Sequence, residues 1–195
     1  ELLGADRGDD ALVAAVNSIF QSVRSLPFPE DWLEEAERMY TRFDGIASSK
    51  WGQILLEEGR ECAAELLARL EKMLPEVAQD EKMNRVRGTA LQSWYRLFAE
   101  LIKALDDNDW DAAVSLTSGF SPAPYTGKLM KYEDTAFKQR VDDLVDSCKT
   151  GLAALQKMFP MPAEECSRLV QGLAPQVSLL FACVTDFMER YQRLK

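Results

Sequence analysis

The stretch MNRVRGTALQSWYRLFAELIKAL, residues 83–105, decides the fold, because its apolar side chains recur at three- and four-residue spacing. That spacing places them on one face of an α-helix. The face carries Met83, Val86, Ala90, Leu91, Trp94, Leu97, Phe98, Leu101, Ile102 and Leu105. A face this wide predicts a central helix that packs against neighbours on two sides.

The same spacing continues on both sides of this stretch and predicts further helices. They cover residues 9–26, 30–44, 48–74, 134–159 and 163–193. We expect Pro75 to end the third and Pro175 to divide the last, because proline has no N–H to donate inside a helix. No stretch alternates apolar and polar side chains as a strand does. The sequence therefore predicts an all-α fold, an antiparallel bundle of about six to eight helices.

The chain has 195 residues, 47% of them hydrophobic, which is enough to bury a core. We expect a single helical-bundle domain over residues 1–195, in which helices of residues 9–44 can pack on a core bundle of residues 48–193. The first residue is Glu1 rather than methionine. This favours a domain excised from a larger protein, so a targeting segment could have been removed.

The stretch LDDNDWDAAVSLTSGFSPAPYTGK, residues 105–128, interrupts the run of long helices. It predicts a short helix over residues 109–117 and then a long ordered loop over residues 118–133. Its acidic residues suit a turn and a helix cap, and Asp109 can cap the short helix. Trp110 and Ala113 are expected to be structural anchors that pin this helix onto the bundle.

The side chains of familiar catalytic sites are scarce. The chain has no histidine, which excludes Ser-His-Asp and Cys-His nucleophile pairs and histidine-containing zinc motifs. Its four cysteines form no C-x-x-C pair, and no glycine-rich phosphate loop is present. We therefore predict no catalytic residues, no metal site and no cofactor, and that the chain is not an enzyme.

Two groups of residues are candidates for binding. The long loop mixes aromatic, proline and lysine side chains that suit contact with a peptide, RNA or protein. We assign protein binding there to Phe120, Pro122, Pro124, Tyr125, Lys128 and Tyr132. A basic patch at Lys82, Arg85 and Arg87 can contact phosphate or an acidic partner, although a solvated helix face is the plainer interpretation.

Residues 62–149 resemble a known family. A helix ends at KMLP, the helix SWYRLFAELIKAL follows, and the turn DDNDWDAAVSL precedes the helix KQRVDDLVDSC. This arrangement resembles the helical domain of the steroid receptor RNA activator protein, which has relatives at the C-terminus of the outer COPII coat scaffold and in a second-step splicing factor. The resemblance implies that Trp110 and Ala113 pack the small helix, and that the chain is a non-catalytic interaction module. The loop at residues 118–134 is longer than in the simple form of that domain.

The net charge of −9 argues against wholesale nucleic-acid binding, because a surface that meets phosphates usually needs a basic excess. No apolar run approaches the length of a membrane span. We thus expect a helical scaffold or adaptor that binds another protein or subunit in the cytoplasm, or alternatively in the nucleus. Two alternatives stay open: an RNA- or phosphate-contacting regulatory domain that uses the basic patch with Lys128 and Lys131, and a bundle that holds an apolar ligand. The oligomeric state is open.

Overall fold

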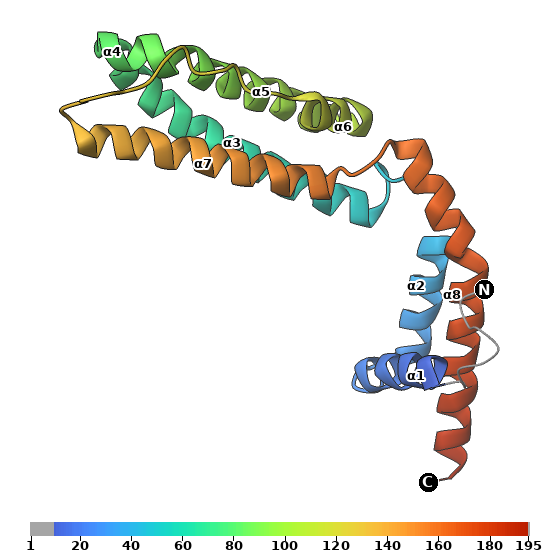
Figure 1. The fold of residues 1–195 in the computed structure, drawn as a ribbon. Helices are drawn as coiled ribbons and strands as arrows, with labels where there is room; N and C mark the ends of the chain where they lie inside the picture. The colour runs from blue at the N-terminus through green and yellow to red at the C-terminus, as the bar shows by residue number, and fades with distance from the viewer. Residues whose placement is uncertain (1–9, 195) are drawn as a thin grey trace. The chain divides into compact units, whose positions relative to one another are not determined.

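The computed structural model describes residues 10–194, so residue 9 of the first predicted helix lies outside the described residues. The all-α prediction is confirmed, since the regular elements in this range are all helical. The elements are α1 (Asp10–Val23), α2 (Pro29–Thr41), α3 (Lys50–Gln79), α4 (Glu81–Met83), the π-helical segment η1 (Asn84–Gly88), α5 (Thr89–Asp106), α6 (Trp110–Gly119), α7 (Thr135–Met158) and α8 (Ala163–Arg193). Figure 1 labels the α-helices.

The chain divides into two compact units. The central unit is Ile46–Ala163, and the terminal unit joins Glu1–Gly45 to Glu164–Lys195. The single domain over residues 1–195 and the packing of residues 9–44 on a core bundle stay predictions.

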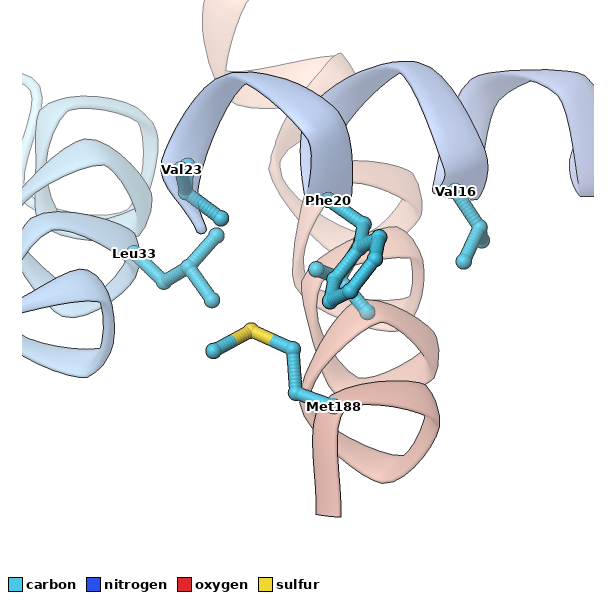
Figure 2. Packing of buried hydrophobic residues seen from close by; sticks show 6 residues of the cluster. Val16, Phe20, Val23, Leu33 and Met188 are labelled. Carbon is cyan, nitrogen blue, oxygen red and sulfur yellow. The ribbon is translucent and has the colours of Figure 1, made fainter. Parts of the chain in front are cut away.

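The terminal unit has its own hydrophobic core, built from α1, α2 and α8 (Figure 2). Phe20 of α1 lies at its centre, with its ring edge-on to the ring of Phe187 at a centroid distance of 5.0 Å. The buried members of the core are Val16, Phe20, Val23, Leu33, Val184 and Met188. Because they come from both ends of the chain, this unit depends on contacts between segments far apart in sequence.

Two helices continue past an internal proline, against the prediction from the sequence. Pro75 lies inside α3 and Pro175 lies inside α8. A proline inside a helix removes one hydrogen bond and crowds the carbonyl four residues earlier. Apolar packing beyond each proline stabilises the continued helix, since Val77 of α3 and Val184 of α8 are buried.

The length and composition of α8 would also let it cross a membrane, the one helix within residues 10–194 for which this holds. The sequence pattern had predicted no apolar run of that length. Length and composition are weak evidence by themselves, because a core helix of a soluble protein passes the same test. In the terminal unit, Val184 and Met188 of α8 are buried against α1 and α2.

The central unit is a bundle in which α3 packs against both α5 and α7, and α6 packs against α5 and α7. The predicted central helix is confirmed in α5, which packs on α3 and on α6. Residues with no exposed surface line the interior on all three long helices. They include Leu70, Leu91, Phe98, Leu101, Val141 and Leu155.

The short helix α6 begins as predicted, with the Asp109 carboxylate accepting a hydrogen bond from the Ala112 N–H at 2.9 Å. Trp110 is 2% exposed, and its indole N–H donates to the Met161 carbonyl at 2.9 Å. Its ring meets Phe159 edge-on at a centroid distance of 5.0 Å. Ala113 is also buried, so the first turn of α6 faces the core.

Candidate functional site

The chain between α6 and α7 runs back along α5 to the start of α7 (Figure 1). We call residues 120–134 the strap. Its first part is fixed to α5. The Phe120 ring lies on the Trp94 ring at a centroid distance of 4.7 Å, and the Ala123 N–H donates to the Ser93 hydroxyl at 3.1 Å. The strap is therefore bound to the bundle from its beginning.

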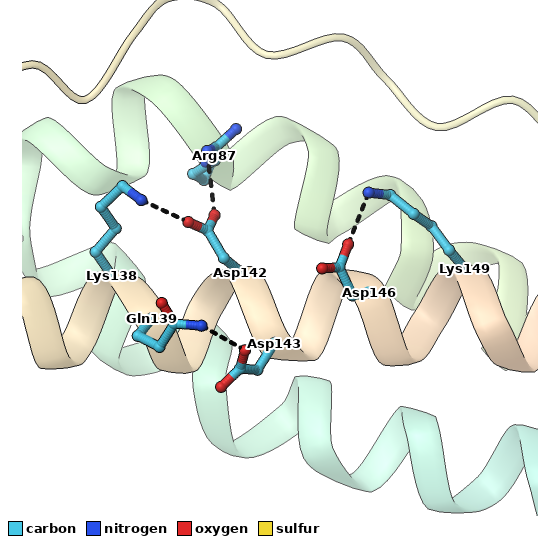
Figure 3. A network of polar contacts seen from close by, with 7 residues as sticks. All are labelled: Arg87, Lys138, Gln139, Asp142, Asp143, Asp146 and Lys149. Atoms are coloured by element: carbon cyan, nitrogen blue, oxygen red, sulfur yellow. Dashed lines mark hydrogen bonds and ion pairs between the residues drawn. The ribbon is translucent and has the colours of Figure 1, made fainter.

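The middle of the strap is held by Arg87, a residue of the predicted basic patch. The Arg87 guanidinium lies over the Tyr125 ring, 3.5 Å from the ring centroid. The same guanidinium donates to the Asp142 carboxylate of α7 at 3.1 Å, and Lys138 binds that carboxylate at 2.7 Å (Figure 3). With a side chain only 13% exposed, Arg87 joins η1, the strap and α7.

Thr126 binds the strap to the π-helical segment. Its N–H donates to the Val86 carbonyl at 3.4 Å, and its hydroxyl donates to the Arg85 carbonyl. A π-helical turn is rare and occurs frequently at functional sites, because it departs from the regular hydrogen bonding of an α-helix. Here Thr126 supplies hydrogen-bond donors to two carbonyls of that turn.

The end of the strap is fixed at α4. The Lys82 ammonium donates to the Met130 carbonyl at 2.9 Å, and the Tyr132 hydroxyl donates to the Asp80 carboxylate. This hydrogen bond lowers the pKa of Asp80, which also caps α4 by accepting from the Met83 N–H. Burial and the bond to Asp80 raise the pKa of Tyr132 to about 12. Near neutral pH the pair is therefore a phenol donating to a carboxylate.

A groove of about 760 Å³ lies beside the strap, between the end of α3, α4, η1 and α5. Arg85 and Arg96 line it, and both are exposed. Among residues 10–194, no ion pair to either arginine is present, in contrast to Arg87. The other polar side chains of its lining are Gln79, Glu81, Asn84, Thr89, Gln92 and Ser93. We call this the Arg85–Arg96 groove.

The elements beside this groove are locally basic although the chain is acidic. Residues 82–99 and 112–132 contain no aspartate or glutamate, and together they carry Lys82, Arg85, Arg87, Arg96, Lys128 and Lys131. The rest of the chain has 17 basic and 32 acidic residues, a balance of −15. The strap contacts bring these two acid-free segments together, while the acidic side chains of Asp80, Glu81 and Asp142 lie beside them.

The structure separates the predicted site residues by their contacts. Phe120, Tyr125 and Tyr132 are engaged with the bundle, whereas Pro122, Pro124 and Lys128 are exposed. Their assignment to protein binding stays a prediction.

Within the basic patch, Lys82 and Arg87 hold the strap, and Arg85 lines the groove. The predicted basic patch did not include Arg96, although Arg96 lies about three helical turns from Arg85 and hence near the same face of the helix. The absence of acidic residues between the two arginines could have indicated that Arg96 belongs to the same basic surface.

No family model matches the chain. Comparison with known proteins finds relatives that are named as one subunit of an ATP-dependent helicase/nuclease. The chain is 25% identical to that of Acetivibrio thermocellus over 203 residues, which cover 100% of this chain and 16% of the relative. It is 26% identical to that of Enterococcus faecalis over 196 residues, 97% of this chain and 15% of the relative. For Ruminiclostridium cellulolyticum the values are 25% over 213 residues, 100% and 16%. The chain thus spans about one sixth of the length of these relatives.

These relatives contradict three expectations drawn from the sequence. The chain was expected to be a non-enzymatic protein-binding scaffold or adaptor, not to be an enzyme, and to be an unlikely partner of nucleic acid. The relatives are subunits of an enzyme whose name includes helicase and nuclease. The resemblance to the steroid receptor RNA activator domain stays a prediction.

The physical reasons for these errors are clear. A search for catalytic groups in a segment that matches about one sixth of a relative does not test the whole relative. The net charge of −9 averages over the chain and conceals the two acid-free segments, residues 82–99 and 112–132. Contact with nucleic acid depends on a local arrangement of side chains, which properties of the whole sequence do not describe.

Proposed function

We propose that this chain is a helical segment of an ATP-dependent helicase/nuclease and contacts the phosphate backbone of nucleic acid through the Arg85–Arg96 groove. The observation that carries the proposal is the match to three such proteins over 97% to 100% of this chain. Helicase and nuclease steps are proposed of the whole protein, and contact with the polymer is proposed of these residues. The predicted cytoplasmic location is kept as part of this proposal.

The chemistry of the groove supports phosphate contact. A guanidinium offers several N–H donors in a planar fork that suits phosphate oxygens. Arg85 and Arg96 are exposed, and the amide side chains of Asn84 and Gln92 add neutral donors beside them. The groove lining contains no aromatic side chain for base stacking. We therefore expect binding that depends strongly on salt and weakly on base sequence.

Salt-dependent binding tests this function. Fluorescence anisotropy would measure the affinity of labelled DNA and RNA oligonucleotides for the full chain between about 50 and 200 mM salt. Neutralising both groove arginines (Arg85→Gln with Arg96→Gln) removes two phosphate contacts. On single strands it should make the slope of log K against log salt shallower by about 1.4.

The matched control removes the same charge elsewhere in the central unit. Lys72 and Lys157 are exposed and lie outside the lining of the groove. Lys72→Gln with Lys157→Gln should leave the slope within about 0.3 of the original, because neither ammonium meets a phosphate in the proposed complex. No binding by the original chain at low salt, or equal losses in both double variants, would overturn the proposed function.

A further inference from the structure

The direction of Arg85 depends on the turn that carries it. Arg85 lies in η1, and Asn84, Arg85 and Gly88 of that segment all line the groove. A π-helical turn adds one residue between hydrogen-bonded groups and so rotates the side chains around it relative to a regular helix. Conversion of this turn to regular α-helix would change where the Arg85 guanidinium points.

The strap holds this turn from outside the helix. The Thr126 hydroxyl donates to the Arg85 carbonyl itself, and the Thr126 N–H donates to the Val86 carbonyl at 3.4 Å. On the next residue of the turn, the Arg87 guanidinium lies 3.5 Å from the centroid of the Tyr125 ring. Two successive strap residues therefore contact three successive residues of the turn.

The strap also forms part of the groove. Ala123 lines it, and the Ala123 N–H donates to Ser93, another lining residue, at 3.1 Å. Thr126 is thus three residues from a groove wall and in direct contact with the backbone of the arginine opposite. A residue outside the lining is therefore hydrogen-bonded to the backbone of a residue within it.

We propose that Thr126 is a positioning residue for nucleic-acid binding: its hydroxyl fixes the π-helical turn and thereby directs the Arg85 guanidinium into the groove. The inference rests on the proposed function of the groove. Thr126 itself touches no phosphate. Its contribution to affinity passes entirely through Arg85 and not through Arg96, which projects from α5 beyond the turn.

The test is a double-mutant cycle on oligonucleotide affinity at low salt. Thr126→Val keeps the shape of the side chain and replaces the hydroxyl with a methyl group. It should weaken binding about 3- to 10-fold, the range of one hydrogen bond. Thr126→Ser keeps the donor and should bind within about twofold of the original chain. In an Arg85→Gln background, Thr126→Val should have no further effect, whereas in an Arg96→Gln background its full effect should remain.

Thermal unfolding separates positioning from general damage to the fold. If Thr126→Val does not fold, Thr126→Ala removes the same hydroxyl without adding a methyl group and takes its place in the cycle. Equal weakening by the Thr126 variant in both arginine backgrounds would overturn the inference, as would unchanged affinity. If Arg85→Gln weakens binding while Thr126→Val does not, the inference fails and the groove function stands. If the original chain binds no oligonucleotide, both fail.

Discussion

Arg87 and Tyr125 form one of the contacts that join the strap to the bundle, with the guanidinium 3.5 Å from the centroid of the ring. The same guanidinium pairs with Asp142 at 3.1 Å, so one side chain binds a loop and a helix at once. This arrangement explains why a basic residue of the predicted patch is mostly buried. The Arg87 charge stabilises the structure beside the groove, while Arg85 and Arg96 leave their charges exposed within it.

Arg87→Gln should loosen the strap. The change removes the cation over Tyr125 and the pair with Asp142, and we expect a loss of about 1–3 kcal/mol in the free energy of unfolding. Hydrogen exchange of the Ala123 and Thr126 amides, both hydrogen-bonded to the bundle, should become faster. Urea unfolding and exchange measured by mass spectrometry would check the two effects.

The matched control is Lys149→Gln. Lys149 pairs with Asp146 at 2.8 Å on the same helix as Asp142, with its side chain 59% exposed. An exposed pair contributes little, so this variant should change the free energy of unfolding by less than about 1 kcal/mol. A strap whose exchange is the same in both variants would contradict the role of Arg87.

Trp110→Ala should destabilise the central unit by about 3–5 kcal/mol, because it removes a buried ring from contact with Phe159. Trp110→Phe keeps an aromatic ring but loses the N–H that donates to the Met161 carbonyl, so its cost should be smaller, about 1–2 kcal/mol. Trp32→Ala is the comparison, since Trp32 is 45% exposed. Equal costs for Trp110→Ala and Trp32→Ala in urea unfolding would show that Trp110 anchors nothing.

The helices were predictable because their cause is local. The apolar spacing of residues 89–105 and the Asp109 cap are short-range patterns, and both have the predicted outcome, whereas residues 84–88 form a π-helical turn that the spacing did not predict. The continuation of α3 through Pro75 was not predictable, because the packing of Val77 that stabilises it depends on the tertiary fold.

The candidate site was predictable only in part, and for the same reason. The basic residues around Arg85 indicated it as a candidate. The groove, however, forms only because the strap returns to η1, over a separation of 41 residues between Arg85 and Thr126. The contacts of Arg87 with Tyr125 and Asp142 also depend on this tertiary arrangement. Sequence spacing gives no information on such a contact, so the buried and the exposed arginine looked alike.

Gly52→Ala should be strongly destabilising, at more than about 3 kcal/mol. A Cβ on Gly52 would overlap the carbonyl oxygen of Ile46, a backbone atom that cannot rotate away as a side chain can. Gly172→Ala is the opposite case, since a Cβ there meets nothing within 4 Å inside α8. It should stabilise the helix by up to about 1 kcal/mol. Thermal unfolding would compare the variants, and similar melting temperatures would contradict the close approach of Gly52 to Ile46.

Alkaline pH should weaken the attachment of the strap at Tyr132. The pKa of Tyr132 is raised from 10.0 to about 12 by burial and by its hydrogen bond to Asp80. A raised folded-state pKa means that the stabilisation is complete below pH 10 and is lost as the pH rises from 10 to 12. The free energy of unfolding should therefore fall across this range in the original chain and fall less in Tyr132→Phe, which cannot ionise.

The acid side of the same pair has the opposite dependence. Because the pKa of Asp80 is lowered in the folded chain, its ionised carboxylate stabilises the fold above the ordinary pKa of 3.8, and this stabilisation is lost as the pH falls below that value.

Tyr40→Phe is the control for the alkaline measurement, because it removes a tyrosine other than the one bonded to Asp80. If the free energy of unfolding falls equally with rising alkaline pH in the original chain and in Tyr132→Phe, the hydrogen bond from Tyr132 to Asp80 does not stabilise the fold.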